Sequence, residues 1–145
     1  MFFTAIRYGL IASSVIIAGF ILAFNIMDSG SGVAETIGWT SMAIGMILIF
    51  LATRSARVQA PAGTIAFTDA LMVGAIMAIM MTLAWVFGFE VVMGDRIHEI
   101  MAGTEWAELY KDPLVRWVMS AAEILPIALL VSLIAGLVES RRKPS

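Results

Sequence analysis

The sequence contains no cysteine and a single histidine, His98. The absence of cysteine excludes disulfides, thiol catalysis and thiolate metal sites, and one histidine excludes multi-histidine metal centres. Charge is also scarce, since 14% of the residues are charged, against about 25% in a soluble domain. The net charge is −2 and no basic run exceeds three residues, which excludes nucleic-acid binding. We therefore expect no metal, no cofactor and no nucleic-acid partner.

Apolar residues make up 61% of the 145 positions and gather in four segments. The segments span residues 2–27, 35–53, 65–92 and 114–138. About 20 helical residues cross the ~30 Å hydrocarbon layer of a bilayer, and no segment shows the period-two alternation of a membrane strand. The pattern predicts a single all-α domain, an integral membrane four-helix bundle that spans the lipid bilayer four times.

The charges between the segments predict how the chain is threaded. The first connection holds Asp28 and Glu35 without a basic residue, whereas the second holds Arg54 and Arg57 without an acid. Residues 141–143 at the C-terminus are all basic. Because short loops rich in Lys and Arg stay in the cytoplasm, we expect a multi-pass protein of the bacterial inner (plasma) membrane with both termini cytoplasmic.

The third connection carries its own helical pattern. Apolar side chains recur at helical spacing within residues 93–101 and again within residues 106–110, with Gly103 between the two stretches. This pattern predicts one or two short amphipathic helices. They either lie on the outer membrane surface or cap the bundle as a packed loop.

Glu123 is the most deeply placed charge of the four segments, and Pro126 follows it in the same segment. Proline removes one helical hydrogen bond and clashes with the carbonyl four residues earlier, here Ala122, so a kink is expected. A carboxyl beside a freed carbonyl forms a polar spot in an apolar helix. Three readings stay open: a site on a proton or ion path, a hydrogen-bonded residue that ties helices together, or part of a small-ligand or lipid-headgroup pocket.

Arg116 precedes Glu123 by seven residues, with Ser120 between them on the same helix face. The axial gap of roughly 10 Å is long for a direct bond, so water or Ser120 would have to bridge it. The other reading is that the Arg116 side chain extends to the outer headgroups.

Arg7 and Asp69 lie at similar depths, each a few residues inside the cytoplasmic end of its segment. Opposite charges at matched depth are less costly together than apart. The sequence therefore predicts an ion pair between the first and third helices, and separate extension of both side chains to water is the alternative.

Small residues recur at every fourth position of three segments. Such stripes let helix backbones approach closely, within one bundle or between subunits. They comprise Ser41 and Gly45; Ala70, Gly74, Ala78 and Thr82; and Ala128, Ser132 and Gly136.

Several short motifs follow one another in a recognisable order. They lie at residues 7–10, 38–45, 54–57, 63–67 and 110–114, and the fourth segment contains Glu-Ile-Leu-Pro at 123–126. In order and spacing the chain resembles the domain-of-unknown-function 4199 family of small bacterial membrane proteins over most of its length. The resemblance implies the membrane location but no activity, catalytic residue or ligand.

No arrangement of catalytic residues is apparent, because no phosphate-binding glycine loop and no histidine pair exist. We therefore expect a non-enzymatic structural or accessory component, working as a homo-oligomer or within a larger membrane assembly. The alternative is a small oligomeric proton, ion or small-solute transporter built around Glu123.

Overall fold

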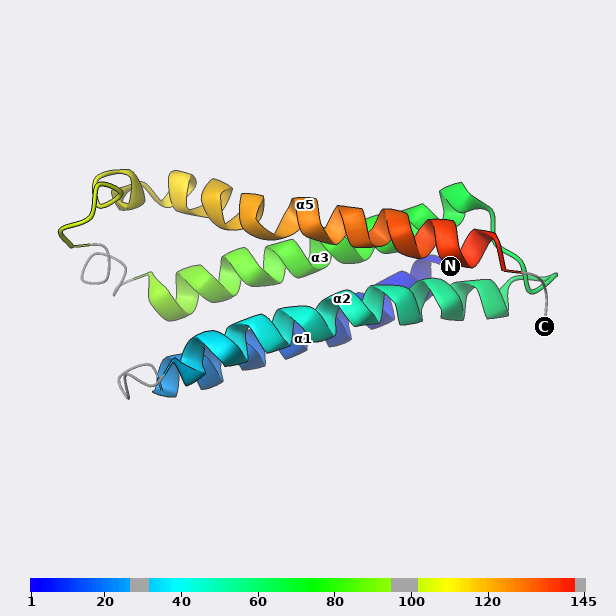
Figure 1. Cartoon of the computed structure of the whole chain (residues 1–145), viewed down its shortest axis with the longest axis horizontal. Coiled ribbons are helices and arrows are strands. Elements are labelled where there is room, and N and C mark those ends of the chain that lie inside the picture. The colour runs from blue at the N-terminus through cyan, green and yellow to red at the C-terminus, as the bar shows by residue number, and fades with distance from the viewer. Residues whose placement is uncertain (27–31, 95–101, 143–145) are drawn as a thin grey trace.

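The computed structural model describes residues 1–26, 32–94 and 102–142. Within these ranges, four long helices make up most of the chain (Figure 1). The long helices are α1 (Phe2–Ile26), α2 (Val33–Gln59), α3 (Phe67–Met93) and α5 (Pro113–Ser140), and a short 3-10 helix, η2 (Leu109–Lys111), precedes α5. Each long helix has the length and apolar composition needed to cross a membrane. The predicted all-α four-helix bundle is confirmed, and the chain has the helices of a multi-pass membrane protein.

The helices run roughly parallel to one long axis, with α3 beside α5 and α1 beside α2 (Figure 1). Helices α2 and α3 each pack against the other three long helices, and the most extensive contacts join α3 to α5, α1 to α2 and α1 to α3. Both termini lie at one end, together with the connection between α2 and α3. We call this the terminal end, and the opposite end, which holds the connection between α3 and α5, the loop end.

Helix α2 is longer than the sequence predicts. The expected segment stopped at residue 53, but the helix continues through Arg54 and Arg57 to Gln59. The charges at 54 and 57 favour a loop in the sequence, yet arginine, serine and alanine are all compatible with a helix. The helix ends where Pro61 approaches, since the residue before a proline disfavours the helical conformation. Ala60 is extended there.

Helix α5 starts where the sequence predicts. The Asp112 side chain accepts a hydrogen bond of 2.9 Å from the Leu114 backbone N–H, and Pro113 occupies the first turn. A capping carboxylate satisfies one of the free N–H groups of a helix start, and proline there lacks only a donor with no helical partner. This fixed start determines where the first turns of α5 lie against α3.

The third connection is described from residue 102 onwards. Residues 102–108 form turns, and η2 forms one turn of 3-10 helix before α5. A short helical segment near residues 106–110 is thus present, but as a 3-10 turn. The helix expected within residues 93–101 falls largely on residues 95–101, which lie outside the described part of the chain.

The core of the bundle consists largely of small and flexible apolar side chains. The predicted small-residue stripes lie inside it: a Cβ added at Gly74 would lie 2.6 Å from Ser132 Cβ, so α3 and α5 touch backbone to side chain. The Ser132 hydroxyl is itself satisfied by the Ala128 carbonyl at 2.7 Å. These stripes therefore join helices of one chain. Fully buried core residues include Ala12, Ile16, Ile49, Ala52, Met77, Ala78, Met81, Ala128 and Ala135.

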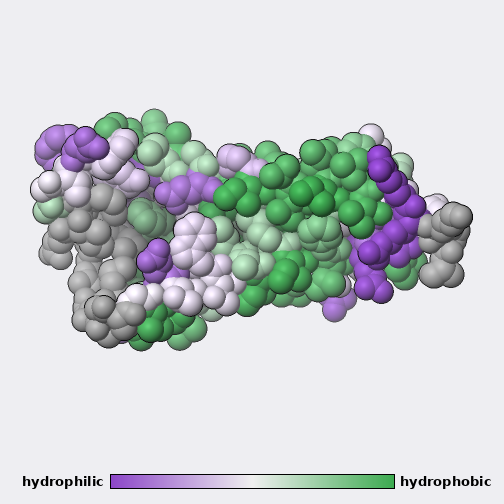
Figure 2. All heavy atoms as spheres, in the orientation of Figure 1, coloured by the Kyte–Doolittle hydropathy of each residue, from purple (hydrophilic) through white to green (hydrophobic). Residues whose placement is uncertain are grey.

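The outer surface has the distribution expected of a protein surrounded by lipid. Figure 2 shows hydrophobic atoms over the broad middle of this face and hydrophilic atoms gathered toward its two ends. Large apolar side chains such as Leu83, Phe87 and Leu130 are more than half exposed. An aqueous solvent would disfavour such a surface, whereas hydrocarbon does not.

Candidate functional site

An ion pair between a buried arginine and a partly exposed glutamate joins α3 to α5 at the loop end. Arg116 Nε donates to Glu90 Oε2 at 3.0 Å, and the Arg116 Nη2 atom donates to the other carboxylate oxygen. The remaining terminal nitrogen donates to the Tyr110 carbonyl at 2.8 Å. The Asp112 cap fixes the start of α5. Arg116, in the first turn of that helix, therefore lies at the same depth as Glu90. The two-pronged contact is the geometry in which arginine binds carboxylates best.

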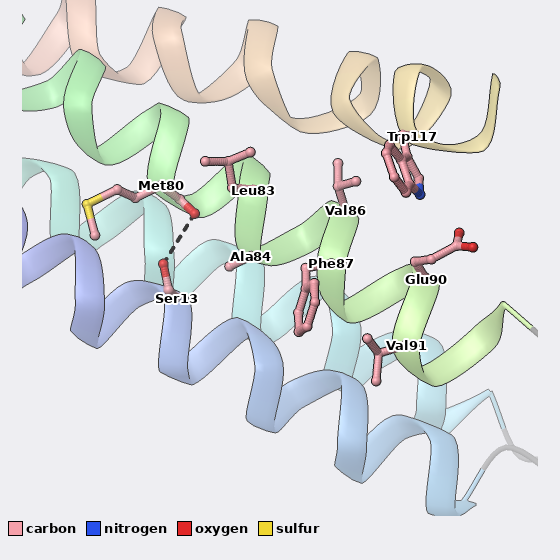
Figure 3. Close-up of a pocket in the computed structure, with 9 residues that line it drawn as sticks. All are labelled: Ser13, Met80, Leu83, Ala84, Val86, Phe87, Glu90, Val91 and Trp117. Carbon is pink, nitrogen blue, oxygen red and sulfur yellow. Dashed lines mark hydrogen bonds between the residues drawn. The ribbon is translucent and has the colours of Figure 1, made fainter. Parts of the chain in front are cut away.

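An apolar cavity of about 710 Å³ lies beside this ion pair (Figure 3). Ser13 from α1 and Trp117 from α5 stand on its two sides, and α3 forms its floor. The Ser13 hydroxyl donates to the Met80 carbonyl at 3.3 Å, so it adds no unpaired polar group. Glu90 is the one charged residue of the lining. The complete lining is Ser13, Met80, Leu83, Ala84, Val86, Phe87, Glu90, Val91 and Trp117.

A second ion pair, in which both side chains are buried, joins α2 to α5 at the terminal end. Arg57 Nε donates to Glu139 Oε2 at 2.8 Å, and the side chains are 7% and 3% exposed. Arg57 also donates to the Gly63 carbonyl at 3.1 Å. The half-exposed Arg142 contacts the other oxygen of Glu139 at 3.2 Å. Each end of the bundle is thus closed by an arginine–glutamate pair between different helices.

Glu123 lies on the exposed flank of α5, while Ser120 and Ile124 on the same helix are buried. Its carboxyl interacts with the indole N–H of Trp85 on α3. The two groups do not have the geometry of a hydrogen bond, and Trp85 Nε1 is buried without another partner. The Trp85 ring packs against Phe20 of α1, with ring centroids 4.7 Å apart.

The predicted polar group on α5 is therefore only partly assembled. Arg116 binds Glu90 rather than reaching Glu123 through Ser120, and its buried side chain does not extend to the headgroups. Pro126 lies within α5, which continues through it to Ser140. Glu123 therefore has neither Arg116 nor Ser120 of its own helix as a polar partner.

The ion pair predicted between Arg7 and Asp69 is not among those formed by the described residues. The recorded pairs are Arg57–Glu139, Arg142–Glu139, Arg116–Glu90 and Lys111–Glu108. Arg7 is exposed and lines a cavity between α1 and α2, whereas Asp69 lies in the first turn of α3. Matched depth does not bring them together, because Arg7 points along the α1–α2 side of the bundle.

Sequence reasoning overlooked the two pairs that do form, although a signal was present. Glu90 lies three residues before the end of α3, and Arg116 lies three residues after the start of α5. Arg57 and Glu139 lie two residues and one residue before the ends of α2 and α5. Both pairs thus satisfy the same matched-depth criterion that suggested Arg7 and Asp69.

The described residues contain no group of three histidine, cysteine, aspartate or glutamate side chains able to hold a metal ion. His98 lies outside the described part of the chain.

Comparison with protein-family models, with curated proteins and with solved structures gives no match for this chain. The resemblance to the domain-of-unknown-function 4199 family stays a prediction from the sequence motifs, and what the protein does has to be inferred from its own geometry.

Proposed function

We propose that the chain is a non-enzymatic structural or accessory component of a membrane assembly, and that it associates with a second copy of itself through the face that carries Glu123. The observation that carries the proposal is the exposed position of Glu123 within α5. It lies ten positions after the helix start at Pro113, which corresponds to about 15 Å, or half of the hydrocarbon layer.

An exposed carboxyl at this depth has to find a polar partner. Placing an acidic side chain at the centre of a membrane helix costs about 2.5–3.5 kcal/mol on insertion scales. Trp85 supplies an electrostatic contact without a regular hydrogen bond. A second copy related by a two-fold axis brings the same surface to itself, and so supplies polar groups at the matching depth.

The rest of the bundle supports a structural role. Both ends are held by ion pairs between helices, and the middle is closely packed through contacts such as Gly74 with Ser132. A rigid bundle of this kind can serve as a scaffold against which neighbouring proteins of the assembly pack. Glu123 lines neither the cavity beside Glu90 nor the cavities lined by Arg7 and by Arg54.

Association can be measured by energy transfer between labelled copies in liposomes at several protein-to-lipid ratios. We expect Glu123→Gln to associate like the parent, because an amide both donates and accepts. Glu123→Leu should associate about 5–30-fold more weakly, since a polar contact between membrane helices contributes about 1–2 kcal/mol in model peptides. Ile47→Ala, which alters an exposed side chain of α2, is the control. A parent protein that stays monomeric at high density would contradict self-association.

The second candidate is a small oligomeric transporter of protons, ions or small solutes that uses Glu123. The observation in its favour is the position of Pro126 three residues after Glu123 in the same helix. A proline frees a backbone carbonyl there, which adds an acceptor next to the carboxyl. Proton flux into liposomes that is present in the parent and absent in Glu123→Gln would establish this role. We expect no flux from either protein.

For the location, we propose the bacterial inner membrane with both termini in the cytoplasm. Arg54, Arg57, Arg141 and Arg142 all lie at the terminal end, which supports this orientation through the excess of basic residues in cytoplasmic segments. Because the chain has no cysteine, single cysteines can report the sidedness. In intact cells an impermeant maleimide should label Glu105→Cys at the loop end and leave Ala62→Cys unlabelled. The reverse pattern would contradict the orientation.

A further inference from the structure

At the terminal end, one arginine on α1 and one on α2 have no ionic partner within the described part of the chain, and neither has Arg141 just after α5. Arg57 and Arg142 both contact Glu139, but Arg7 on α1 and Arg54 on α2 are exposed and join none of the recorded ion pairs. Charges on a membrane helix are costly without a counter-charge or water. This end therefore offers two free guanidinium groups on neighbouring helices.

The two arginines line adjoining cavities on the α1–α2 side. Arg7 lines one of about 310 Å³, and Arg54 lines one of about 300 Å³. Tyr8, Ser55 and Gln59 line both cavities, so the two form a continuous cleft. We call it the α1–α2 cleft. Its full lining is Phe3, Thr4, Arg7, Tyr8, Ile11, Leu51, Arg54, Ser55, Val58 and Gln59.

The polar groups of the α1–α2 cleft are arranged to donate hydrogen bonds. Gln59 Nε2 donates to Ser55 Oγ at 2.9 Å, and Thr4 Oγ1 donates to Gln59 Oε1 at 3.2 Å. Ser55 thus accepts from Gln59 and keeps its own proton for an outside acceptor. No aspartate or glutamate belongs to the lining. Two guanidinium groups and a free serine hydroxyl suit an anion, and arginine matches the oxygens of phosphate with paired donors.

The depth of the cleft indicates what kind of anion fits. Arg7 lies five residues from the start of α1 and Arg54 five residues from the end of α2, so each is about 8 Å along its helix from the terminal end. The exposed side chains of Ile11 and Leu51, 44% and 43% accessible, lie about one turn farther toward the centre. The cleft therefore presents positive charge near the headgroup level and apolar surface directly beneath it.

We propose that the α1–α2 cleft binds an anionic phospholipid, with its phosphate between Arg7 and Arg54 and an acyl chain along Ile11 and Leu51. The charged headgroup of such a lipid matches the two arginines, and its apolar acyl chain matches the apolar side chains that lie deeper in the cleft. Free phosphate shares the first part of this chemistry but makes no use of the second. The binding site does not involve Glu123 and does not depend on self-association.

The test measures lipid binding to the detergent-purified full chain by native mass spectrometry, with three probes added separately. These are phosphatidylglycerol, phosphatidylcholine and inorganic phosphate. We expect phosphatidylglycerol to bind the parent best. A basic residue near an anionic lipid contributes about fivefold in affinity, so Arg7→Gln and Arg54→Gln should each lose about fivefold and the double variant about 25-fold.

The matched control is Arg141→Gln, which removes an exposed positive charge at the same end but from outside the cleft. It should bind phosphatidylglycerol like the parent. Because Arg7 and Arg54 are exposed and unpaired, the variants should unfold at the parental temperature without lipid, which separates lost binding from lost folding. Equal binding by parent and double variant would overturn the proposal. It would also be overturned by an equal loss in Arg141→Gln, by equal binding of phosphatidylcholine, or by inorganic phosphate that binds as tightly as the lipid.

Discussion

The two ends of the bundle use the same pair of residue types but bury them differently. At the terminal end Arg57 and Glu139 are 7% and 3% exposed, whereas at the loop end Arg116 and Glu90 are 6% and 26% exposed. Each arginine also donates to a backbone carbonyl near the end of a helix. At the terminal end both charged groups are shielded from solvent, so each needs the other as its counter-charge. At the loop end the Glu90 carboxylate is still partly accessible at the surface.

This difference predicts which pair is harder to break. Removing one partner of a buried ion pair leaves an uncompensated charge, which costs far more than the intact pair contributes. A carboxylate that reaches water or headgroups can be solvated again after its partner is lost. The terminal end should therefore be the more sensitive end, although its direct contact uses a single pair of atoms.

The largest effect is expected from Glu139→Leu, which leaves Arg57 buried and unpaired. We expect a loss of about 3–5 kcal/mol in the free energy of unfolding, measured by denaturant titration in detergent micelles. Leucine at both positions 57 and 139 should recover much of it, because no charge is then left behind. Glu108→Gln, which breaks the exposed pair with Lys111, is the control and should cost under about 1 kcal/mol. Losses that simply add in the double variant would contradict the interdependence.

A smaller effect is expected at the loop end from Arg116→Gln. The change removes the two-pronged contact to Glu90, and hydrogen bonds to a charged group contribute about 1.5–3 kcal/mol. The free energy of unfolding should fall by that amount in the same titration. Glu90 is the more exposed partner, so Glu90→Gln, which leaves Arg116 buried, should cost more than Arg116→Gln. A cost of Arg116→Gln equal to that of Arg57→Gln, which leaves the more deeply buried Glu139 without this partner, would remove the distinction between the two ends.

The smallest effect is expected from Asp69→Asn. Asp69 lies in the first turn of α3, where a negative charge stabilises a helix by about 0.3–1 kcal/mol through the helix dipole. The loss should be the same in the parent and in an Arg7→Gln background, because the two residues do not pair in the structure. A coupling of more than about 0.5 kcal/mol between them would indicate the ion pair that the sequence predicts.

The sequence predicts the number of helices and most of their boundaries, because the hydrocarbon layer sets the length of every segment. It also predicts the start of α5 to within one residue, since the expected segment begins at 114 and the helix at Pro113, and the close approach of Gly74 to another helix. Depth along the bundle can thus be derived from residue numbers alone.

Rotation about each helix axis could not be derived in the same way. In a soluble helix an apolar stripe shows which side faces the core, but these helices are apolar on nearly every side. Depth alone therefore suggests an ion pair between Arg7 and Asp69, and it does not distinguish that pair from the one that Glu90 forms with Arg116. For the same reason the sequence identified Glu123 as the deepest charge but did not show that its flank of α5 is exposed.

The terminal ion pair also has a consequence for the order in which contacts between the helices form during synthesis. Arg57 and Glu139 are 82 residues apart, whereas Glu90 and Arg116 are 26 residues apart. At elongation rates of about 5–20 residues per second the ribosome adds the intervening 82 residues in roughly 4–16 s. During that interval Arg57 has no carboxylate to bind and must stay at the aqueous surface. The end of α2 therefore gains this ion pair only after α5 has been synthesised, so a residue of α5 completes the packing of α2.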